Sequence, residues 1–415
     1  MLTLDDIAVK GKNVFVRSDL NSSIDEKTGE IASFERIEVY AETIKELSEK
    51  GARVVVISHQ GRPGDYDFIS LEKHAKALEE TIGKHVEFID DIYCRYARHK
   101  IKNMHNGHII LLDNIRMLSE ESLERPPEEH ARSIFIQKLY PLCHYYVLDA
   151  FSAAHRPHAS IVGFATLVPT VAGRAMEREI KSLKAAVDNP RKPVVLVVGG
   201  AKVKDSLKII EHWIKNNLTD KILTCGLVGN VMLAASGKKL GKSDEYLRNS
   251  GFGPLIEEGK GLLDKHGDRI LLPEDVAFND GGRREIGVDE LPVNAEIWDI
   301  GMATCEKYGE VIGGAGTIVI NGPAGVYESA GFEKGTKEIL GAIANSGAYS
   351  LVGGGNTVDA IDKLGLAKEK FTYISVAGKA FIEFVSGKEL PGIKALEISE
   401  EKFRGSLERR THQHQ

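Results

Sequence analysis

The chain has 415 residues, with 54 Lys and Arg against 60 Asp and Glu, which gives a formal net charge of −6. This mild acidic excess argues against a general nucleic-acid-binding protein, which would carry a basic surface. No apolar run reaches the roughly 18 residues that a membrane span needs. The 42 glycines against 13 prolines indicate many positions at which the backbone approaches another group closely.

Neither the N-terminus nor the cysteines indicate secretion or a structural metal. The first residues, MLTLDDIAVKGKN, lack the basic segment and apolar core of a signal peptide. The four cysteines (Cys94, Cys143, Cys225 and Cys305) form no C-x-x-C pair. We therefore expect a cytoplasmic protein with reduced thiols and no structural zinc.

Short apolar runs rich in Val and Ile alternate with stretches of helical period. The runs occupy residues 14–16, 54–57, 109–112, 145–148, 194–198, 221–223, 269–272, 317–320, 350–352 and 371–375. Their lack of polar alternation is typical of parallel strands that are buried on both faces. Ten strands are too many for one sheet, so the pattern predicts an α/β protein of two Rossmann-like lobes, each a parallel sheet flanked by helices.

Three helices are clear from the sequence. Residues 34–50 place Ile37, Tyr40, Ile44 and Leu47 on one stripe, and Ser33 stands where an N-cap is expected. Residues 203–215 form a second helix. Residues 174–189 form a third, followed by Pro190 and Pro193, which we interpret as a hinge helix between the two lobes.

Polar residues follow each apolar run at once, which places them at the carboxyl ends of strands, where open parallel sheets bind ligands. In the first half these residues are Asp19, Asn21, His59, Arg62, Arg116, His155, Arg156 and His158, with Arg36 at the start of a helix. Arginine favours bidentate recognition of carboxylate or phosphate, so we infer a small, hydroxylated and strongly anionic ligand. The alternative is that the arginines only pair with surplus acids and that the histidines, His155 above all, are structural.

The second half offers glycine in the same places. Gly199-Gly200 and Gly353-Gly354-Gly355 each precede a predicted helix, and Lys202 opens the first of them. Glycine lets the backbone amides at a helix N-terminus approach a phosphate closely. We therefore favour a nucleotide site over the alternative that these glycines serve only to form tight turns. The chain contains no G-x-x-x-x-G-K-[ST] motif, no G-x-G-x-x-G at a strand–helix junction, and no HRD or DFG element. The absence of these motifs argues against a P-loop NTPase and against a protein kinase. It also weakens the assignment as a dehydrogenase.

Taken in order, the motifs RSDLN, SHQGRP, LLDNIR, DAFSAAHRPHAS, GGAK, NGPAGVYE and GGGNT resemble the phosphoglycerate kinase family, and in particular its archaeal branch. The resemblance runs from Val14 to about Leu396. It implies an N-terminal domain (1–173) for 3-phosphoglycerate or 1,3-bisphosphoglycerate, a connecting helix (174–189) and a C-terminal domain (190–387) for ADP or ATP with Mg²⁺. Residues 388–415 are expected to return towards the N-terminal domain.

The resemblance also implies roles for individual residues. Asp19, Asn21, Arg36, His59, Arg62, Arg116 and Arg156 would bind the glycerate. Gly200, Lys202, Ser206, Asn321, Pro323, Glu328, Gly353, Gly354, Gly355, Asn356 and Thr357 would bind the nucleotide, with Glu328 on the ribose. Arg36, Lys202, Gly354 and Gly355 would stabilise the transferring phosphoryl group, which passes directly between the ligands when the lobes close.

Two positions depart from the family pattern. Ser206 stands where the family usually has Lys, one helical turn after Lys202, so one positive charge is lost. Asn356 replaces the Asp of the familiar GGGDT, so an oxygen remains for Mg²⁺ but without the charge that the metal favours. These departures keep open a non-catalytic anion-binding or nucleotide-binding relative, and another nucleotide-dependent transferase or a dehydrogenase is a further alternative. The protein is expected to be a monomer or a homodimer.

Overall fold

The computed structural model describes residues 1–411 and divides the polypeptide into two compact units. The first unit contains Met1–Ile180 and the described residues from Glu389 onward, and the second contains Lys181–Lys388. The last four residues of the predicted segment 388–415 lie outside the described part of the chain. Within residues 1–411, no helix is both long and apolar enough to cross a bilayer.

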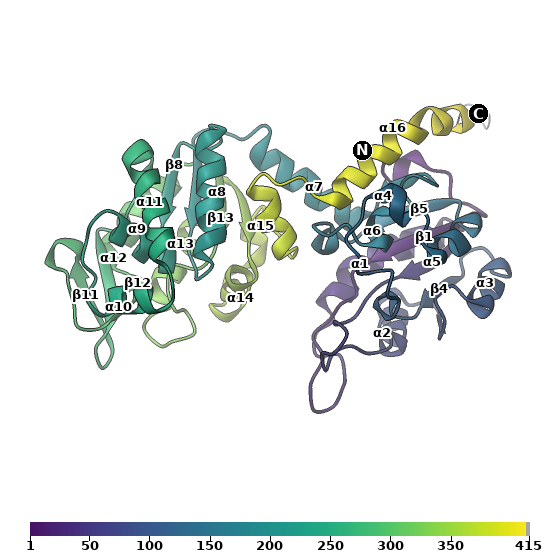
Figure 1. Ribbon diagram of the computed structural model, residues 1–415, viewed down its shortest axis with the longest axis horizontal. Helices are drawn as coiled ribbons and strands as arrows, with labels where there is room; N and C mark the ends of the chain where they lie inside the picture. Colours follow the sequence, from purple (N-terminus) through teal and green to yellow (C-terminus); the bar gives the residue numbers. More distant parts are fainter. Residues whose placement is uncertain (412–415) are drawn as a thin grey trace. The chain divides into compact units, whose positions relative to one another are not determined.

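The first unit is built on a six-stranded parallel sheet of order β3-β4-β2-β1-β5-β6. Figure 1 labels strands β1, β4 and β5 of this sheet. Its strands are β1 (Asn13–Ser18), β2 (Arg53–Ile57), β3 (Val86–Ile89), β4 (Ile109–Leu112), β5 (Tyr145–Asp149) and β6 (Thr170–Ala172). Its helices are α1 (Glu35–Glu49), α2 (Glu72–Ile82), α3 (Arg95–Lys102), α4 (Pro127–His130), α5 (Ile134–Leu139), α6 (Ala159–Val162) and α16 (Pro391–Thr411), with 3₁₀ turns at Leu4–Asp6, Ile115–Met117, Tyr140–Leu142 and Phe151–Ala153.

The central strand β1 shows why the apolar runs lack alternation. Val14 and Val16 pack into one hydrophobic core with α1 and α2, while Phe15 between them packs into a second core with α3 and α5. Both faces of the sheet are therefore covered, and every second residue must be apolar for each face. The predicted stripe on α1 is buried as expected, but Ser33 is not its cap: the N-cap is Phe34, which makes no side-chain bond.

The second unit contains a six-stranded parallel sheet of order β15-β14-β13-β7-β8-β9. These strands are β7 (Val194–Val198), β8 (Lys221–Thr224), β9 (Ile270–Leu271), β13 (Thr317–Asn321), β14 (Tyr349–Gly353) and β15 (Tyr373–Ile374). The helices are α8 (Val203–Lys215), α9 (Gly226–Ala235), α10 (Lys242–Asn249), α11 (Gly253–His266), α12 (Met302–Gly313), α13 (Lys334–Asn345), α14 (Gly355–Lys363) and α15 (Lys379–Val385), with 3₁₀ turns at Val288–Glu290 and Lys368–Lys370.

The second unit also carries a small antiparallel sheet that the sequence reasoning missed. Its order is β11-β10-β12, formed by β10 (Asp275–Asn279), β11 (Arg283–Gly287) and β12 (Glu296–Ile300). Each strand mixes charged and apolar residues, so none reads as a continuous apolar run. The prediction of an α/β fold with two parallel sheets is nevertheless confirmed.

Helix α7 (Arg174–Val187) begins at the edge of the first sheet and continues into the second unit. Its first turn is fixed by side chains of the first unit: Asp149 accepts a hydrogen bond from the amide of Met176 at 2.8 Å, and Thr43 accepts one from the amide of Arg174 at 2.9 Å. Such acceptors satisfy amides that a helix N-terminus leaves unpaired. The predicted hinge motion about this helix stays a prediction.

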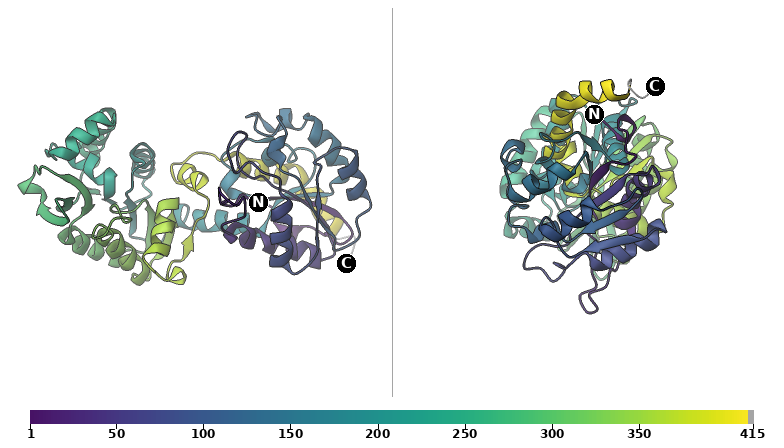
Figure 2. Two further views of the ribbon diagram at one scale, coloured as in Figure 1. Left: turned by 90° about the horizontal axis from the view of Figure 1, so that it is seen from below. Right: turned by 90° about the vertical axis from the view of Figure 1, so that its right-hand side faces the viewer.

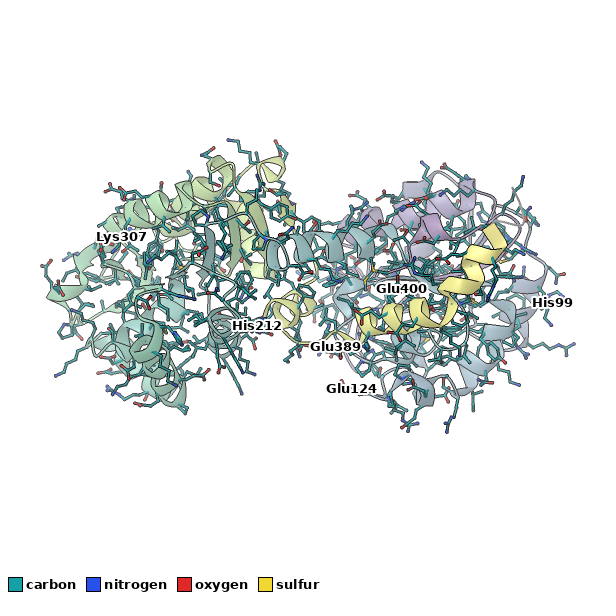
Figure 3. All side chains as sticks on the ribbon, turned by 90° about the horizontal axis from the view of Figure 1, so that it is seen from above. His99, Glu124, His212, Lys307, Glu389 and Glu400 are labelled. Carbon is teal, nitrogen blue, oxygen red and sulfur yellow. The ribbon has the colours of Figure 1, made fainter. Side chains whose placement is uncertain are left out.

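Helix α16 lies along the first unit beside the N-terminus of the chain (Figures 1 and 2), and its residue Glu400 is labelled in Figure 3. The amino group of Met1 pairs with Glu400 at 2.5 Å, and the amide of Thr170 on the edge strand β6 donates to the hydroxyl of Ser399 at 2.6 Å. Ser399 is fully buried. The C-terminal helix therefore completes the edge of the first sheet.

Replacing Ser399 with Ala should destabilise the first unit by about 1–3 kcal/mol, because the buried amide of Thr170 would lose its acceptor. Ser406→Ala on the same helix is the matched control, since the hydroxyl of Ser406 bonds only within the helix, to the carbonyl of Phe403. Urea unfolding followed by circular dichroism measures both. Equal stability of the two variants would contradict a structural role for the Ser399 bond.

Candidate functional site

The side chains predicted for the anionic ligand gather at one end of the first sheet. They follow four strands that are neighbours in the sheet, β4, β2, β1 and β5. Asp19 and Asn21 follow β1, His59 and Arg62 follow β2, Arg116 follows β4, Arg156 follows β5, and Arg36 lies in the first turn of α1. Because the strands are parallel, their carboxyl ends bring these groups from distant parts of the sequence to one edge.

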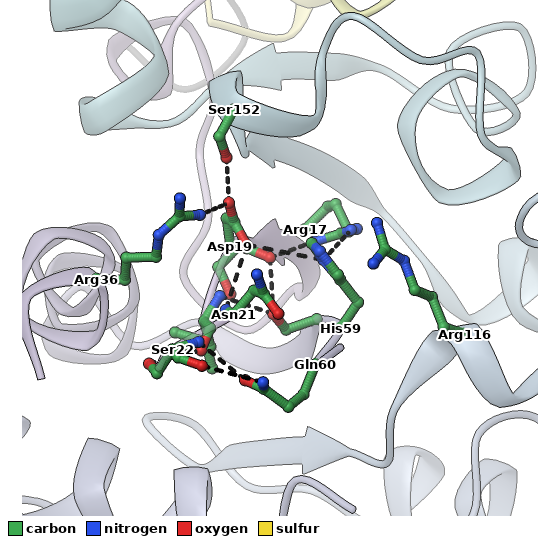
Figure 4. A network of polar contacts seen from close by, with 12 residues as sticks. Arg17, Asp19, Asn21, Ser22, Arg36, His59, Gln60, Arg116 and Ser152 are labelled. Carbon is green, nitrogen blue, oxygen red and sulfur yellow. Dashed lines mark hydrogen bonds and ion pairs between the residues drawn. The ribbon is translucent and has the colours of Figure 1, made fainter. Parts of the chain in front are cut away.

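Asp19 is at the centre of this cluster (Figure 4). It is buried, forms an ion pair with Arg36 and accepts a hydrogen bond from the hydroxyl of Ser152. Burial acts to raise the pKa of Asp19, but the charges of Arg36 and Arg17 and the Ser152 hydroxyl outweigh it, so the pKa lies well below its usual range. Asp19 is therefore a permanent negative charge that holds Arg36 at the sheet edge.

His59 is neutral and its proton can be assigned. Burial, followed by the nearby arginines Arg17, Arg116 and Arg36, lowers the pKa of His59 well below 6.5, and the opposing effect of Asp19 is too small to reverse this. Its Nδ1 lies 2.9 Å from Nη2 of Arg17. A guanidinium can only donate, so Nδ1 accepts and the proton of His59 is on Nε2.

The arginines at the strand ends outnumber the acids beside them. Burial lowers the pKa of Arg116 to about 10, and repulsion from Arg17 and Arg156 adds to the shift. Glu121 is the second buried acid nearby, but burial raises its pKa, and its two oxygens accept hydrogen bonds from the amide and hydroxyl of Ser160. The cluster thus keeps a positive excess that a bound anion would relieve.

The remaining candidate site residues in the first unit differ in their exposure to solvent. Arg62 is exposed in its loop, whereas Asn21 accepts a hydrogen bond from the amide of Gly61 at 2.8 Å. His155 lies 2.9 Å from the carbonyl of Ser152 through Nδ1. His158 is buried, and burial together with Arg116 and Arg156 lowers its pKa to about 3. His158 is therefore neutral and supports the structure around the site, which is the structural alternative given for the histidines in the sequence analysis.

The sequence reasoning missed three residues that hold the cluster together. Arg17 is 1% exposed although it carries a charge, and it donates through Nε to Ser160 at 2.8 Å. The hydroxyl of Ser152 donates to Asp19, and the buried Tyr40 lies close enough to Asp19 and Arg36 for their charges to affect its pKa. Arg17 lies inside the RSDLN motif, so the motif could have identified it as a candidate site residue. Tyr40 was assigned to the apolar stripe of α1, and nothing in the spacing indicates that its hydroxyl reaches the site.

The second unit contains a cavity of about 320 Å³ at the ends of β7, β8 and β13. This volume is at the lower end of the range for small-molecule sites. It brings together four of the predicted nucleotide residues, Gly200, Pro323, Glu328 and Asn356. Apolar side chains line much of the rest, namely Leu227, Tyr246, Leu247, Pro273, Val276, Trp298 and Val326. A largely apolar cavity with a few polar groups in its lining suits a planar base with a polar tail.

Two helix N-termini lie at the strand ends of this unit. Lys202 is the N-cap residue of α8 and is exposed, and Gly354 is the N-cap residue of α14 with φ of 86°. Asn321 ends β13, Gly353 ends β14 against Phe381, and Gly355 begins α14. Gly322, with φ of 95°, lies so close to β7 that a Cβ would collide with the carbonyl of Gly199. Only glycine allows the two loops to approach in this way.

Two of the predicted nucleotide residues lie behind the surface. Ser206 is fully buried on α8, and its hydroxyl has no hydrogen-bond partner among the described residues. Thr357 is also buried, and its hydroxyl accepts a hydrogen bond from the amide of Gly322 at 2.8 Å. Thr357 therefore acts on the loop that lines the cavity.

Across residues 1–411, no group of three His, Cys, Asp or Glu side chains has the arrangement of a metal site.

Comparisons with known proteins find relatives that match nearly the whole chain. The family model described as phosphoglycerate kinase matches residues 4–388. A phosphoglycerate kinase of Methanobacterium bryantii is 44% identical over 405 residues, which cover 97% of this chain and 98% of the relative. One from Sulfurisphaera tokodaii is 41% identical and covers 95% of both chains. The crystal structure of phosphoglycerate kinase from Pyrococcus horikoshii aligns with a TM-score of 0.87 and 40% identity, covering 97% of this chain and 100% of that one.

His59 should remain neutral well below pH 6.5 in the folded protein, with its proton on Nε2. Since the unfolded chain protonates His59 near its ordinary pKa of 6.5, the unfolded state binds more protons below that pH. This residue therefore makes the folded state less stable as the pH falls below about 6.5. Nitrogen NMR of ¹⁵N-labelled histidine reports both the tautomer and the titration. A His59 signal that titrates near pH 6.5 would contradict the assignment.

Proposed function

The chain belongs to the phosphoglycerate kinase family, and we propose that it catalyses reversible phosphoryl transfer between 1,3-bisphosphoglycerate and ADP, which gives 3-phosphoglycerate and ATP. The two ligands would occupy the strand ends of the two units, the acid in the first and the nucleotide in the second. A non-catalytic relative, a dehydrogenase and another transferase are not favoured, because the family match extends over nearly the whole chain.

The positive excess around Arg116 is the observation that carries the acid site. Arg17 and Arg156 both repel the half-buried Arg116, and a phosphate or carboxylate placed beside it would relieve that repulsion. Asp19 and the neutral His59 add an acceptor and a donor, which suit the hydroxyl and carboxylate of a glycerate. Arg62 and Asn21 complete the proposed contacts with the acid.

The nucleotide would place its base in the apolar part of the cavity and its ribose near Glu328. The phosphates would run towards the N-termini of α8 and α14, where Lys202 and the amides of Gly354 and Gly355 supply positive ends without bulk. Gly200, Gly353, Asn321 and Pro323 shape the loops on either side, while Ser206 and Thr357 support them from behind.

We propose a direct in-line transfer with no covalent enzyme intermediate. Phosphoryl transfer depends on positioning and on charge stabilisation more than on a nucleophile from the protein. Arg36, Lys202 and the glycine amides would stabilise the charge on the transferring oxygens. The buried Asp19 keeps Arg36 oriented at the edge of the acid site, so the carboxylate acts through the guanidinium.

Mg²⁺ fits this arrangement through the nucleotide. Magnesium keeps several waters and binds through phosphate oxygens with only one or two protein ligands. Asn356 lines the cavity and offers one side-chain oxygen, so it would hold the ion together with the phosphates. The ion would neutralise phosphate charge.

We also propose a cytoplasmic location, since all four cysteines are free, three of them buried and Cys94 exposed. A monomeric or homodimeric state stays a prediction.

Formation of ATP from 1,3-bisphosphoglycerate and ADP, measured with and without Mg²⁺, tests the proposed reaction. Arg36→Ala should reduce turnover by about 10²–10³-fold, in line with the loss of a single electrostatic donor. Arg95→Ala, which removes an exposed arginine from α3, should leave the rate unchanged. Near-normal turnover of Arg36→Ala would exclude this role for Arg36.

Asn356→Asp should shift the Mg²⁺ titration of turnover to lower concentrations, because a carboxylate binds this ion better than an amide oxygen. The matched control is Asn345→Asp, which adds the same charge at an exposed position at the end of α13. If both variants follow the wild-type titration, Asn356 is not near the metal.

A further inference from the structure

The small antiparallel sheet of the second unit carries one buried arginine, which is paired with Asp299 of the cavity lining. Arg283 begins β11, and its side chain is 8% exposed, while that of the next residue, Arg284, is 66% exposed and pairs with Asp280. Burial acts to lower the pKa of Arg283, but its hydrogen bonds and ion pairs with Asp299 and Glu285 raise it above its ordinary value. A buried arginine with this many partners is held in one orientation.

All three nitrogens of the Arg283 guanidinium are used. Nη1 donates to Asp299 at 2.7 Å and to the carbonyl of Gly331 at 3.0 Å. Nη2 donates to the carbonyl of Ile300 at 2.9 Å, and Nε to Glu285 at 2.8 Å. The guanidinium thus joins three pieces of chain: β11, the end of β12 and the loop between β13 and α13.

Asp299 extends the same connection. Its side chain is fully buried, and besides Arg283 it accepts a hydrogen bond from the amide of Gly335 at 2.8 Å. A Cβ at either Gly325 or Gly335 would collide with this carboxylate. Residues at both ends of the 325–335 segment therefore pack directly on Asp299, and Arg283 neutralises its charge.

The segment fixed in this way carries Glu328. Upstream of Glu328, the amide of Val326 donates to the carbonyl of Trp298 at 2.8 Å, and downstream the carbonyl of Gly331 accepts a hydrogen bond from Arg283. Val326, Glu328 and Trp298 all line the cavity. The position of the Glu328 carboxylate thus depends on an anchor at each end of the 326–331 segment.

We propose that Arg283 is a positioning residue for nucleotide binding, which fixes the 326–331 segment so that Glu328 meets the ribose hydroxyls. The proposal rests on the nucleotide site proposed above. A buried ion pair contributes little net stability compared with apolar residues of the same size, whereas it does fix geometry through directional bonds. Arg283 makes no contact with the reactants and acts through the Gly331 carbonyl and Asp299.

The test compares the affinity of the full-length protein for ADP and for 2′,3′-dideoxy-ADP, both with Mg²⁺, by calorimetry. Arg283→Met should weaken ADP binding about tenfold and leave dideoxy-ADP within twofold, because only ADP has the hydroxyls that Glu328 would meet. Arg284→Met is the matched control and should change neither affinity. Arg283→Lys keeps the charge but lacks the planar fork, so it should also lose discrimination between the two nucleotides.

Arg283→Met combined with Asp299→Asn removes both buried charges and covers the case in which the single variant does not fold. Folded variants that discriminate the two nucleotides as the wild type does would overturn the proposal and leave Arg283 a purely structural residue. A wild-type protein that binds ADP but does not turn over 1,3-bisphosphoglycerate would refute the proposed reaction and leave this test intact. A wild type that binds neither nucleotide would refute both.

Discussion

The ion pair between Asp19 and Arg36 is the interaction around which the first unit's site is organised. A site for a multiply charged anion must collect cations, and cations that gather at a sheet edge repel one another. Asp19 counters this repulsion with one buried charge that stays ionised, since its pKa is held well below the usual range by the cations around it. It orients Arg36 and leaves Arg116 and Arg156 unneutralised, so the positive excess faces the place where an acid would bind.

The second unit is proposed to bind a larger ligand with fewer charged side chains. A nucleotide is large, and its phosphates need backbone amides as well as charges, so glycine loops and helix N-termini replace the arginine cluster. The buried ion pair of Arg283 with Asp299 supports the wall of the cavity, which Asp299 lines. We therefore propose that the chain holds the small acid through charged side chains and the nucleotide through backbone amides.

Much of this could be predicted because parallel sheets impose a simple pattern. Continuous apolar runs reveal strands buried on both faces, and the polar residues after them must share one edge, which is how Asp19 and Arg116 were found. The small antiparallel sheet was missed because strands such as Arg283–Gly287 are half exposed and carry charges. The roles of Arg17 and Tyr40 depend on which buried groups meet across the fold, and sequence spacing carries no record of that.

Hydrogen exchange with each ligand alone tests most directly the claim that the two units divide the ligands. With 3-phosphoglycerate, slower exchange is expected in the segments around residues 58–62, 114–117 and 150–156 of the first unit. With MgADP, it is expected around residues 199–203, 322–331 and 353–357 of the second. Protection of the second unit by 3-phosphoglycerate, or of the first by MgADP, in the absence of the other ligand would contradict the account.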